Sequence, residues 1–264
     1  MIKFTLFGLG EAGSIFASDL IMLGHEVCAY DPAFVVTPAA VKRFDNPVEA
    51  VADAEIIISA TAAADSIQAL EQALNYLPKS VLYADFSTAS ASLKKQLAAT
   101  AASHGIDFVD VALLAVVPGK GIRTTALVAG SGAYRFVEVF SQFGMPVESI
   151  GSNAGDAATR KLLRSVFMKG MAAVVIEAMK AGEKADQLEW LWGNICTEIT
   201  QGDAKLLHRL VEGTGPHALR RLHEMEASEE LLTDLGVEPV MTRSTVQSLK
   251  NVLQEGLPKI PVEG

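Results

Sequence analysis

The sequence has little cysteine. Cys28 and Cys196 are the only two, and they stand far apart without a CxxC or a Cys/His cluster. A disulfide framework and a structural zinc site are therefore not expected. We expect the protein to work in a reducing, cytoplasmic setting. The five histidines show no HxxxH or comparable spacing. We accordingly predict that the protein binds no metal.

Positive charge and long apolar runs are also scarce. The chain has 22 Lys and Arg against 31 Asp and Glu, a formal net charge of −9. It thus lacks the basic excess of proteins that bind nucleic acid or anionic membranes. The longest segment without a charged residue, Thr124 to Tyr134, is too short to span a bilayer, and the N-terminus does not resemble a secretory signal. Half of the 264 residues are hydrophobic, enough to bury a sizeable core. We expect a protein that acts on small molecules.

The first part of the chain alternates short apolar runs with helical segments. This alternation predicts βαβ units on a parallel sheet. Segments such as EIIISA are apolar nearly throughout, as expected when helices cover both faces of the sheet. The expected strands are Ile2–Phe7, Glu26–Tyr30, Glu55–Ala60, Val81–Ala84, Asp107–Val111, Thr125–Ala129 and Pro146–Ser149, and the helices Glu11–Leu23, Asp65–Tyr76, Ala89–His104 and Tyr134–Phe143.

The character of the sequence changes after about Gly155. A long helical pattern from Asp156 to Lys184 is followed by four shorter ones, each ended by glycine, and no further strand is expected. The sequence therefore predicts an α/β protein with two domains, an N-terminal Rossmann domain over residues 1–155 and an all-α C-terminal domain over 156–264. Trp190 and Trp192 are expected to pack helices together.

Three glycines follow the first expected strand. Gly8, Gly10 and Gly13 form GxGxxG between a strand and a helix, the context in which this spacing cradles a dinucleotide pyrophosphate. The first glycine makes the turn, the second lets the backbone approach a phosphate, and the third lets the helix pack on the strand. The helix N-terminus adds unpaired N–H groups. We expect the whole turn to contact the cofactor: Gly8, Leu9, Gly10, Glu11, Ala12 and Gly13.

An acidic residue supports the dinucleotide interpretation. Asp31 ends the second expected strand, where a carboxylate would accept hydrogen bonds from the adenosine ribose. Alone, it could equally form a turn before Pro32. Its charge would repel a 2′-phosphate, so NAD is favoured as the cofactor, while NADP stays possible because Lys42 and Arg43 could approach. Thr61, Ala62 and Ser87 follow the third and fourth strands at the edge where ligands bind; helix capping is the alternative for Ser87 and Thr88.

A polar row runs along the long helix. Lys161, Ser165 and Lys169 recur every four residues and share a face, while most of the other side chains near them are apolar. Lys161 and Lys169 could simply face water. Alternatively, Lys161 faces a cleft as a general acid/base, with burial and a positive nicotinamide lowering its pKa.

Several motifs resemble one family. FGLGEAGS, DFSTAS, DVALLAVVPGKG and SNAGDAATRKLLRS are similar, in order and spacing, to the β-hydroxyacid dehydrogenase family related to 6-phosphogluconate dehydrogenase. VFMKGMAAVVIEA and HALRRLHEMEASEELLTDLGVEPVM resemble a largely uncharacterised subgroup with a distinctive C-terminal helical domain. The resemblance implies that Lys161, after Gly155, is the catalytic lysine and that subunits pair through their helical domains as a homodimer.

Other positions depart from the family pattern. Leu114, Ala115 and Val116 stand where the family has Ser-Gly-Gly for the substrate carboxylate, and Ser165 stands where it has an asparagine. Lys120 and backbone N–H groups of Val117–Gly121 could restore polar contacts. His223 occupies a late-helix position where the family is polar, and it too is a candidate for substrate binding.

The expected activity is the reversible oxidation of a secondary alcohol in a small β-hydroxy acid or related metabolite, with Lys161 as general acid/base. Two alternatives stay open. The chain could reduce imines on the same scaffold, against which Lys161 argues, since family members that reduce imines usually lack this lysine. It could also bind the cofactor for a regulatory purpose without catalysis, as the altered wall at Leu114–Val116 suggests.

Overall fold

The computed structural model describes residues 1–33 and 36–260. The chain forms two compact units, Met1–Arg164 and Ser165–Gly264. The two units divide inside one long helix, whereas the sequence predicts a domain boundary at residues 155/156. The first turns of that helix, including Lys161, therefore belong to the first unit.

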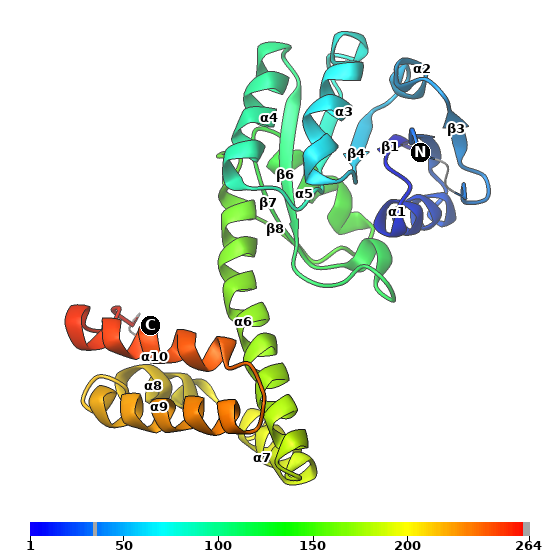
Figure 1. Cartoon of the computed structure of the whole chain (residues 1–264). Helices are drawn as coiled ribbons and strands as arrows, with labels where there is room; N and C mark the ends of the chain where they lie inside the picture. Colours follow the sequence, from blue (N-terminus) through cyan, green and yellow to red (C-terminus); the bar gives the residue numbers. More distant parts are fainter. Residues whose placement is uncertain (34–35, 261–264) are drawn as a thin grey trace. The chain divides into compact units, whose positions relative to one another are not determined.

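The first unit contains an eight-stranded sheet in the order β3-β2-β1-β4-β5-β6-β7-β8 (Figure 1). Its strands are β1 (Lys3–Phe7), β2 (Glu26–Tyr30), β3 (Lys42–Phe44), β4 (Ile56–Ser59), β5 (Leu82–Asp85), β6 (Asp107–Leu113), β7 (Ala126–Ala129) and β8 (Val147–Ser149). Its helices are α1 (Glu11–Met22), α2 (Pro47–Val51), α3 (Ser66–Ala73), α4 (Ala91–Ser103) and α5 (Ala133–Gln142), with 3₁₀ turns η1 (Ala63–Asp65), η2 (Leu74–Tyr76) and η3 (Gly121–Arg123). The predicted Rossmann-type fold is confirmed.

One strand pair departs from the parallel sheet that the sequence predicts. β6 and β7 are antiparallel, and the other neighbouring strands are parallel. The connection between them contains only the short turn η3 and no α-helix. An antiparallel neighbour needs no helical crossover, so this short connection can join two adjacent strands. The sequence predicts neither β3 nor α2, which are short and carry little periodicity.

The core of the first unit has two layers, one on each face of the sheet. Ile56 and Ile58 of β4 belong to the cluster that contains α1 and α5 residues, and Ile57 belongs to the cluster that contains α3 and α4 residues. Successive strand residues point to opposite faces, so a strand covered on both faces must be apolar at every position. This confirms the interpretation of EIIISA.

The second unit is helical. α6 (Asp156–Lys184) enters it from the first unit, and it continues with α7 (Leu188–Thr200), α8 (Ala204–Glu212), α9 (Ala218–Asp234) and α10 (Val240–Glu255). Glu177 of α6 caps α10: its carboxylate accepts hydrogen bonds from the N–H groups of Met241 (2.7 Å) and Thr242 (2.8 Å) and from the Thr242 hydroxyl (2.7 Å). Burial alone would raise the pKa of Glu177, but these hydrogen bonds outweigh it and lower the pKa.

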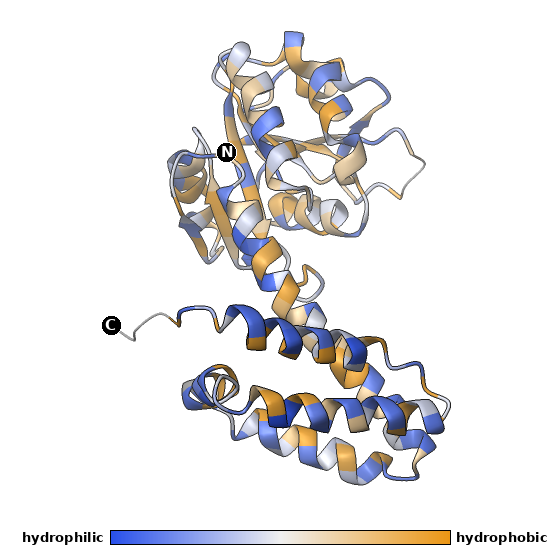
Figure 2. Ribbon diagram, turned by 60° about the vertical axis from the view of Figure 1, so that its left-hand side comes forward, coloured by the Kyte–Doolittle hydropathy of each residue, from blue (hydrophilic) through white to orange (hydrophobic). Residues whose placement is uncertain are grey.

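Large apolar side chains of the second unit are exposed, contrary to expectation. Trp190 and Trp192 are 67% and 53% exposed, so they do not pack helices together within the chain. Phe167 of α6 is 57% exposed, and α7 has no buried residue. The helices carry hydrophobic and hydrophilic residues side by side along their length (Figure 2). One copy of this small unit offers too few neighbouring helices to cover all of its apolar surface.

Candidate functional site

The turn after β1 brings two backbone segments unusually close together. A Cβ at Gly13 would lie 2.0 Å from the carbonyl oxygen of Gly8, and a Cβ at Gly8 would lie 2.8 Å from the carbonyl oxygen of Ala60. Gly8 also has φ = +92°, a conformation that side chains disfavour. Gly10 differs, because a Cβ there would meet nothing within 4 Å. Gly8 and Gly13 therefore build the turn, while Gly10 leaves open space beside the first turn of α1.

Asp31 is tied directly to this turn. Its Oδ2 accepts the N–H of Leu9 (2.7 Å), and its Oδ1 accepts the N–H of Ala33 (2.8 Å). The N–H of Gly8 donates to the carbonyl oxygen of Tyr30 (3.0 Å), just before Asp31. The carboxylate is thus fixed beside the glycine turn, and each oxygen keeps a lone pair for a further donor.

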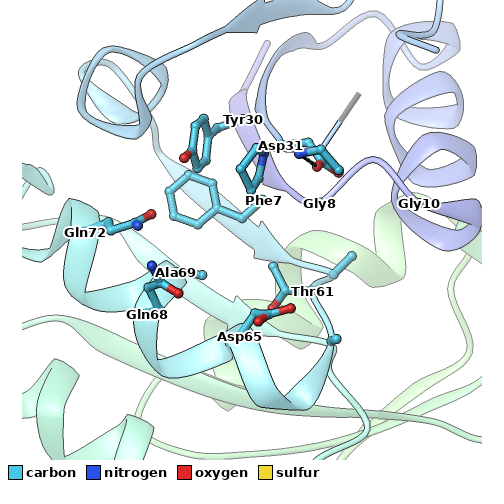
Figure 3. A pocket seen from close by; sticks show the side chains of 14 residues that line it. Phe7, Gly8, Gly10, Tyr30, Asp31, Thr61, Asp65, Gln68, Ala69 and Gln72 are labelled. Carbon is cyan, nitrogen blue, oxygen red and sulfur yellow. Dashed lines mark hydrogen bonds between the residues drawn. The ribbon is translucent and has the colours of Figure 1, made fainter. Parts of the chain in front are cut away.

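A cavity of about 400 Å³ opens at the carboxyl ends of β1, β2 and β4 (Figure 3). Its volume lies within the range of small-molecule sites. Several predicted cofactor residues line it, together with apolar and polar side chains; the full lining is Phe7, Gly8, Gly10, Tyr30, Asp31, Pro32, Ala33, Ala60, Thr61, Ala62, Asp65, Gln68, Ala69 and Gln72.

One wall of this cavity comes from a helix that no sequence motif marks as a site. Gln68, Ala69 and Gln72 lie on α3, on the side opposite Tyr30 (Figure 3). The two amide side chains and the rings of Phe7 and Tyr30 together offer hydrogen bonds and an apolar surface to a flat heterocycle. These glutamines sit on an ordinary surface helix, and no motif in the sequence marks them.

The other predicted residues of the turn play different parts. Leu9 is 2% exposed and packs into the core, so only its backbone faces the turn. Glu11 is exposed in the first turn of α1, and Ala12 packs against the core.

The predicted residue Ser87 lies in the loop after β5. It is buried and donates its hydroxyl to Asp85 Oδ2 (2.7 Å). Ser90, rather than Ser87 or Thr88, caps α4.

Arg43 lies close to Asp31 but is held by backbone atoms. Its guanidinium donates to the carbonyl oxygens of Asp31 (2.8 Å) and Ala33 (2.9 Å). Lys42 has its ammonium over the ring of Phe44, 4.7 Å from the centroid. Both cations thus have protein partners in this structure.

Lys161 meets the loop that follows β5. Its Nζ donates to the hydroxyl oxygen of Thr88 (2.9 Å), across 73 positions of sequence. β5 is parallel to β4, so Thr88, Thr61 and the glycine turn all follow the carboxyl ends of neighbouring strands. The structure therefore places the lysine at the edge of the sheet where ligands bind in open α/β folds.

The residues that replace the family's Ser-Gly-Gly, Leu114 to Val116, follow β6. Leu114 and Ala115 are half-buried, and Val116 is 72% exposed. The N–H groups of Lys120 and Gly121 donate to the carbonyl oxygen of Val117 (3.0 and 2.8 Å), so the turn uses them itself. The Lys120 side chain lines a separate cavity of about 430 Å³ beside α1, not the one at the glycine turn.

Two predicted substrate residues belong to the second unit. Ser165 lies on α6 one turn after Lys161, and the exposed His223 lies on α9. Near His223, Arg220 pairs with Glu224 (3.6 Å), and Arg221 hydrogen bonds to Thr214. Both arginines thus make contacts within the helical unit, and a substrate role for Ser165 and His223 stays a prediction.

Known proteins share this architecture. Residues 3–151, more than half of the chain, match the family described as the NAD binding domain of 6-phosphogluconate dehydrogenase. The chain belongs to this family. Residues 183–252 match a second family, described as a domain of unknown function. The predicted resemblance is thus confirmed, and the first unit is the NAD(P)-binding domain of an oxidoreductase.

Individual relatives are more distant. The 2-(hydroxymethyl)glutarate dehydrogenase of Eubacterium barkeri is 25% identical, over 80% of this chain and 75% of its own. An imine reductase from Myxococcus stipitatus in complex with NAD+ has a TM-score of 0.79 at 17% identity, covering 97% of this chain and 95% of its own. A reductive aminase from Aspergillus terreus in complex with NADPH has a TM-score of 0.77 at 18% identity, with the same coverage. These two structures share the fold.

The described residues were also expected to form neither a metal site nor a membrane-spanning helix. Among residues 1–33 and 36–260, no three His, Cys, Asp or Glu side chains gather as a metal site would require. None of the helices described is both long and apolar enough to cross a membrane.

Substitution of single glycines separates the two roles of the turn. We expect Gly10→Ala to lower the free energy of unfolding by only about 1 kcal/mol, because its Cβ meets open space, yet to weaken NAD binding at least tenfold by obstructing the first turn of α1. Gly13→Ala should instead destabilise the fold by about 3 kcal/mol or more, because its Cβ meets a backbone oxygen.

Calorimetric NAD titration and urea unfolding measure both effects. Gly193→Ala, on α7 where a Cβ also meets nothing within 4 Å, is the matched control: it should leave NAD affinity unchanged and raise the free energy of unfolding by about 1 kcal/mol, because alanine is favoured over glycine inside a helix. Unchanged NAD affinity in the Gly10 variant would refute a pyrophosphate site at this turn.

Proposed function

We propose that the protein is an NAD-dependent dehydrogenase that reversibly oxidises the alcohol of a small β-hydroxy acid, with Lys161 as general acid/base. The observation that carries the proposal is the hydrogen bond from Lys161 Nζ to Thr88 Oγ1 (2.9 Å). It holds the amine at the same sheet edge as the glycine turn and Asp31. A general acid/base must lie within reach of the reacting groups, and the position of Lys161 at this sheet edge supports that role.

The chemistry divides between the cofactor and the protein. When bound, NAD supplies the hydride acceptor. Gly8, Gly10 and the first turn of α1 would hold its pyrophosphate, and Asp31 its adenosine ribose. Lys161 would take the hydroxyl proton during oxidation and return it during reduction. Thr88 orients the amine because its hydroxyl oxygen accepts one N–H of Lys161.

NAD rather than NADP is the proposed cofactor. The Asp31 carboxylate lies beside the turn with both oxygens directed to backbone N–H groups. A 2′-phosphate there would place negative charge against it. Arg43, which could pair with such a phosphate, instead donates to two carbonyl oxygens.

The substrate class rests on the lysine and on the relatives' names. The relative from Eubacterium barkeri is named for 2-(hydroxymethyl)glutarate, a β-hydroxy acid whose alcohol is a hydroxymethyl group. The proposed alcohol can therefore be primary as well as secondary. The apolar residues Leu114 and Val116 favour a substrate that presents hydrocarbon to that wall.

Imine reduction is the second candidate, because the solved structures with this fold include imine reductases. Lys161 argues against it, since the imine-reducing members of the family usually lack this lysine. The third candidate function is a regulatory one, in which the protein binds the cofactor without catalysing a reaction.

We further propose that two copies of the chain form a homodimer through their helical units. Phe167, Trp190 and Leu210 are 57%, 67% and 53% exposed, and α7 has no buried residue. Exposed apolar patches on proteins mark interaction sites, and these large side chains are candidates for one. A second copy offers the same apolar helices, as a symmetric interface requires.

Lys161→Met tests the reaction. A panel of hydroxy acids, oxo acids and imines with both cofactors, followed by nicotinamide absorbance, should identify a hydroxy acid that is oxidised. The variant should then lose about 10²- to 10⁴-fold in kcat, while NAD affinity stays near that of the wild type. Lys169→Met, two turns along α6, is the matched control and should retain turnover.

Each alternative predicts a different outcome. Near-normal turnover by folded Lys161→Met would reject the mechanism, and turnover of imines alone would favour imine reduction. NAD binding without turnover across the panel would favour the non-catalytic role.

Asp31→Ser tests the cofactor preference. The loss of a charged acceptor should weaken NAD binding about tenfold, and the loss of its repulsion should strengthen NADP binding relative to NAD. Titration with each cofactor measures both. Asp45→Asn, an exposed acid just after β3, should leave the ratio of affinities unchanged. A ratio unaltered by Asp31→Ser would contradict the assignment.

The homodimer is tested by sedimentation velocity at micromolar concentration. The wild type should sediment with the mass of two chains, and Phe167→Glu should shift it toward one. Tyr134→Glu changes an aromatic residue of the first unit that is 74% exposed, and it should leave the dimer intact. A monomeric wild type would refute the proposal.

A further inference from the structure

A fully buried charge cluster lies beneath the loop that carries Thr88. Lys94 of α4 is 1% exposed, and Asp85 of β5 and Asp110 of β6 are both completely buried. Lys94 Nζ lies 2.7 Å from Asp85 Oδ2 and 3.3 Å from Asp110 Oδ1, and it also donates to the backbone oxygen of Asp85 (2.7 Å). The two aspartates are register partners on neighbouring strands, so one ammonium can bridge both.

Asp110 extends this cluster to the helix that carries Lys161. Its Oδ2 accepts the N–H of Gly155 (3.0 Å) and the N–H of Ala158 (3.0 Å), at the N-terminus of α6. A carboxylate at this end of a helix satisfies unpaired N–H groups and interacts favourably with the helix dipole. These contacts also offset the second negative charge, which Lys94 alone does not neutralise.

Asp85 extends the cluster to the loop after β5. Its Oδ2 accepts the hydroxyl of Ser87 (2.7 Å), the residue next to Thr88. The start of α6 also lies tightly against the start of α4, because a Cβ at Gly155 would be 2.8 Å from the carbonyl oxygen of Ala91. Both partners of the Lys161–Thr88 hydrogen bond are thus anchored to one buried cluster.

We propose that Asp110 and Lys94 are positioning residues for Lys161: Asp110 fixes the first turn of α6, and Lys94 locks it to the loop that presents Thr88. The inference rests on the proposed function only for its catalytic consequence. The placement of the Lys161 amine depends on the cluster whatever the reaction is.

The physical reason is that hydrogen bonds between charged groups fix the orientation of the segments that carry them as well as the distance between those segments. Buried ion pairs contribute little net stability compared with apolar packing, but removal of one member leaves an uncompensated group. Asp110→Asn would keep one acceptor and turn the other oxygen into a donor, which must then face either Lys94 or two backbone N–H groups. Either orientation breaks one side of the link, to Lys94 or to the first turn of α6, so we expect Lys161 to move relative to Thr88.

Lysine methyl NMR measures this movement without a substrate. Reductive methylation with ¹³C-formaldehyde labels exposed lysine amines, and Lys161→Arg assigns the Lys161 signal. Thr88→Val gives the chemical shift of Lys161 without its hydroxyl partner. We expect Asp110→Asn to move the signal toward that position. Asp156→Asn, which removes the same charge from the first turn of α6, should leave it in place.

Labelling of Lys94 reports on the folding of Asp110→Asn, because this buried amine should react only in unfolded protein. Circular dichroism reports on the folding of variants that lack Lys94. If Asp110→Asn proves unfolded, Lys94→Gln is the second variant, since its amide retains a donor for the carboxylates on a side chain one bond shorter. It too should shift the Lys161 signal. A folded Asp110→Asn or Lys94→Gln protein with Lys161 at its wild-type chemical shift would overturn the proposal.

Turnover gives the catalytic consequence. With a substrate identified, Asp110→Asn should lower kcat by about 10²-fold, with the KM for NAD retained. A purely structural residue would lower thermal stability without moving either the Lys161 signal or the kcat of the folded fraction. Turnover by Lys161→Met would reject the proposed function, whereas the NMR shifts test the positioning network separately.

Discussion

The candidate site depends on one close approach, that of the Cα of Gly13 to the carbonyl oxygen of Gly8. No side chain fits between them, because a Cβ would lie 2.0 Å from that oxygen. The contact brings the start of α1 directly onto the end of β1, which leaves the first turn of the helix beside open space at Gly10. It also places the N–H of Leu9 where Asp31 can accept it. A longer turn would lose both the anion-binding geometry and the link to β2.

A second constraint comes from the order of the strands. β1, β4 and β5 are parallel neighbours, so the segments after them emerge at one edge of the sheet. The glycine turn, Thr61 and Thr88 therefore converge although they are far apart in sequence. Lys161 joins them because α6 begins at the same edge, where Asp110 accepts two of its N–H groups. The glycine turn thus fixes the segment after β1, and the buried charges fix the segment after β5, two strands along the same sheet edge.

Much of this could be predicted from the sequence, for identifiable reasons. The glycine turn and Asp31 are local patterns tied to a strand, and α6 spans the same residues as the predicted helix because its helical pattern is unbroken. β3 and α2 have three and five residues, too few to show a period. Gln68 and Gln72 reach the cavity only through tertiary packing. The antiparallel β7 and the Glu177 cap likewise depend on contacts between distant segments.

Lys94 shows the limit of sequence reasoning most clearly. A lysine followed by a second lysine on an alanine-rich helix is typical of a solvated face, yet Lys94 is 1% exposed while its neighbour Lys95 is exposed. Nothing local distinguishes the two. The difference arises because α4 packs over β5 and β6, where two buried carboxylates at paired positions require a cation. Since Asp85, Asp110, Lys94 and Lys161 all belong to the first unit, the geometry of the amine is set by the cofactor-binding domain itself. The Lys161–Thr88 hydrogen bond, on which the proposed mechanism rests, thus lies within that unit.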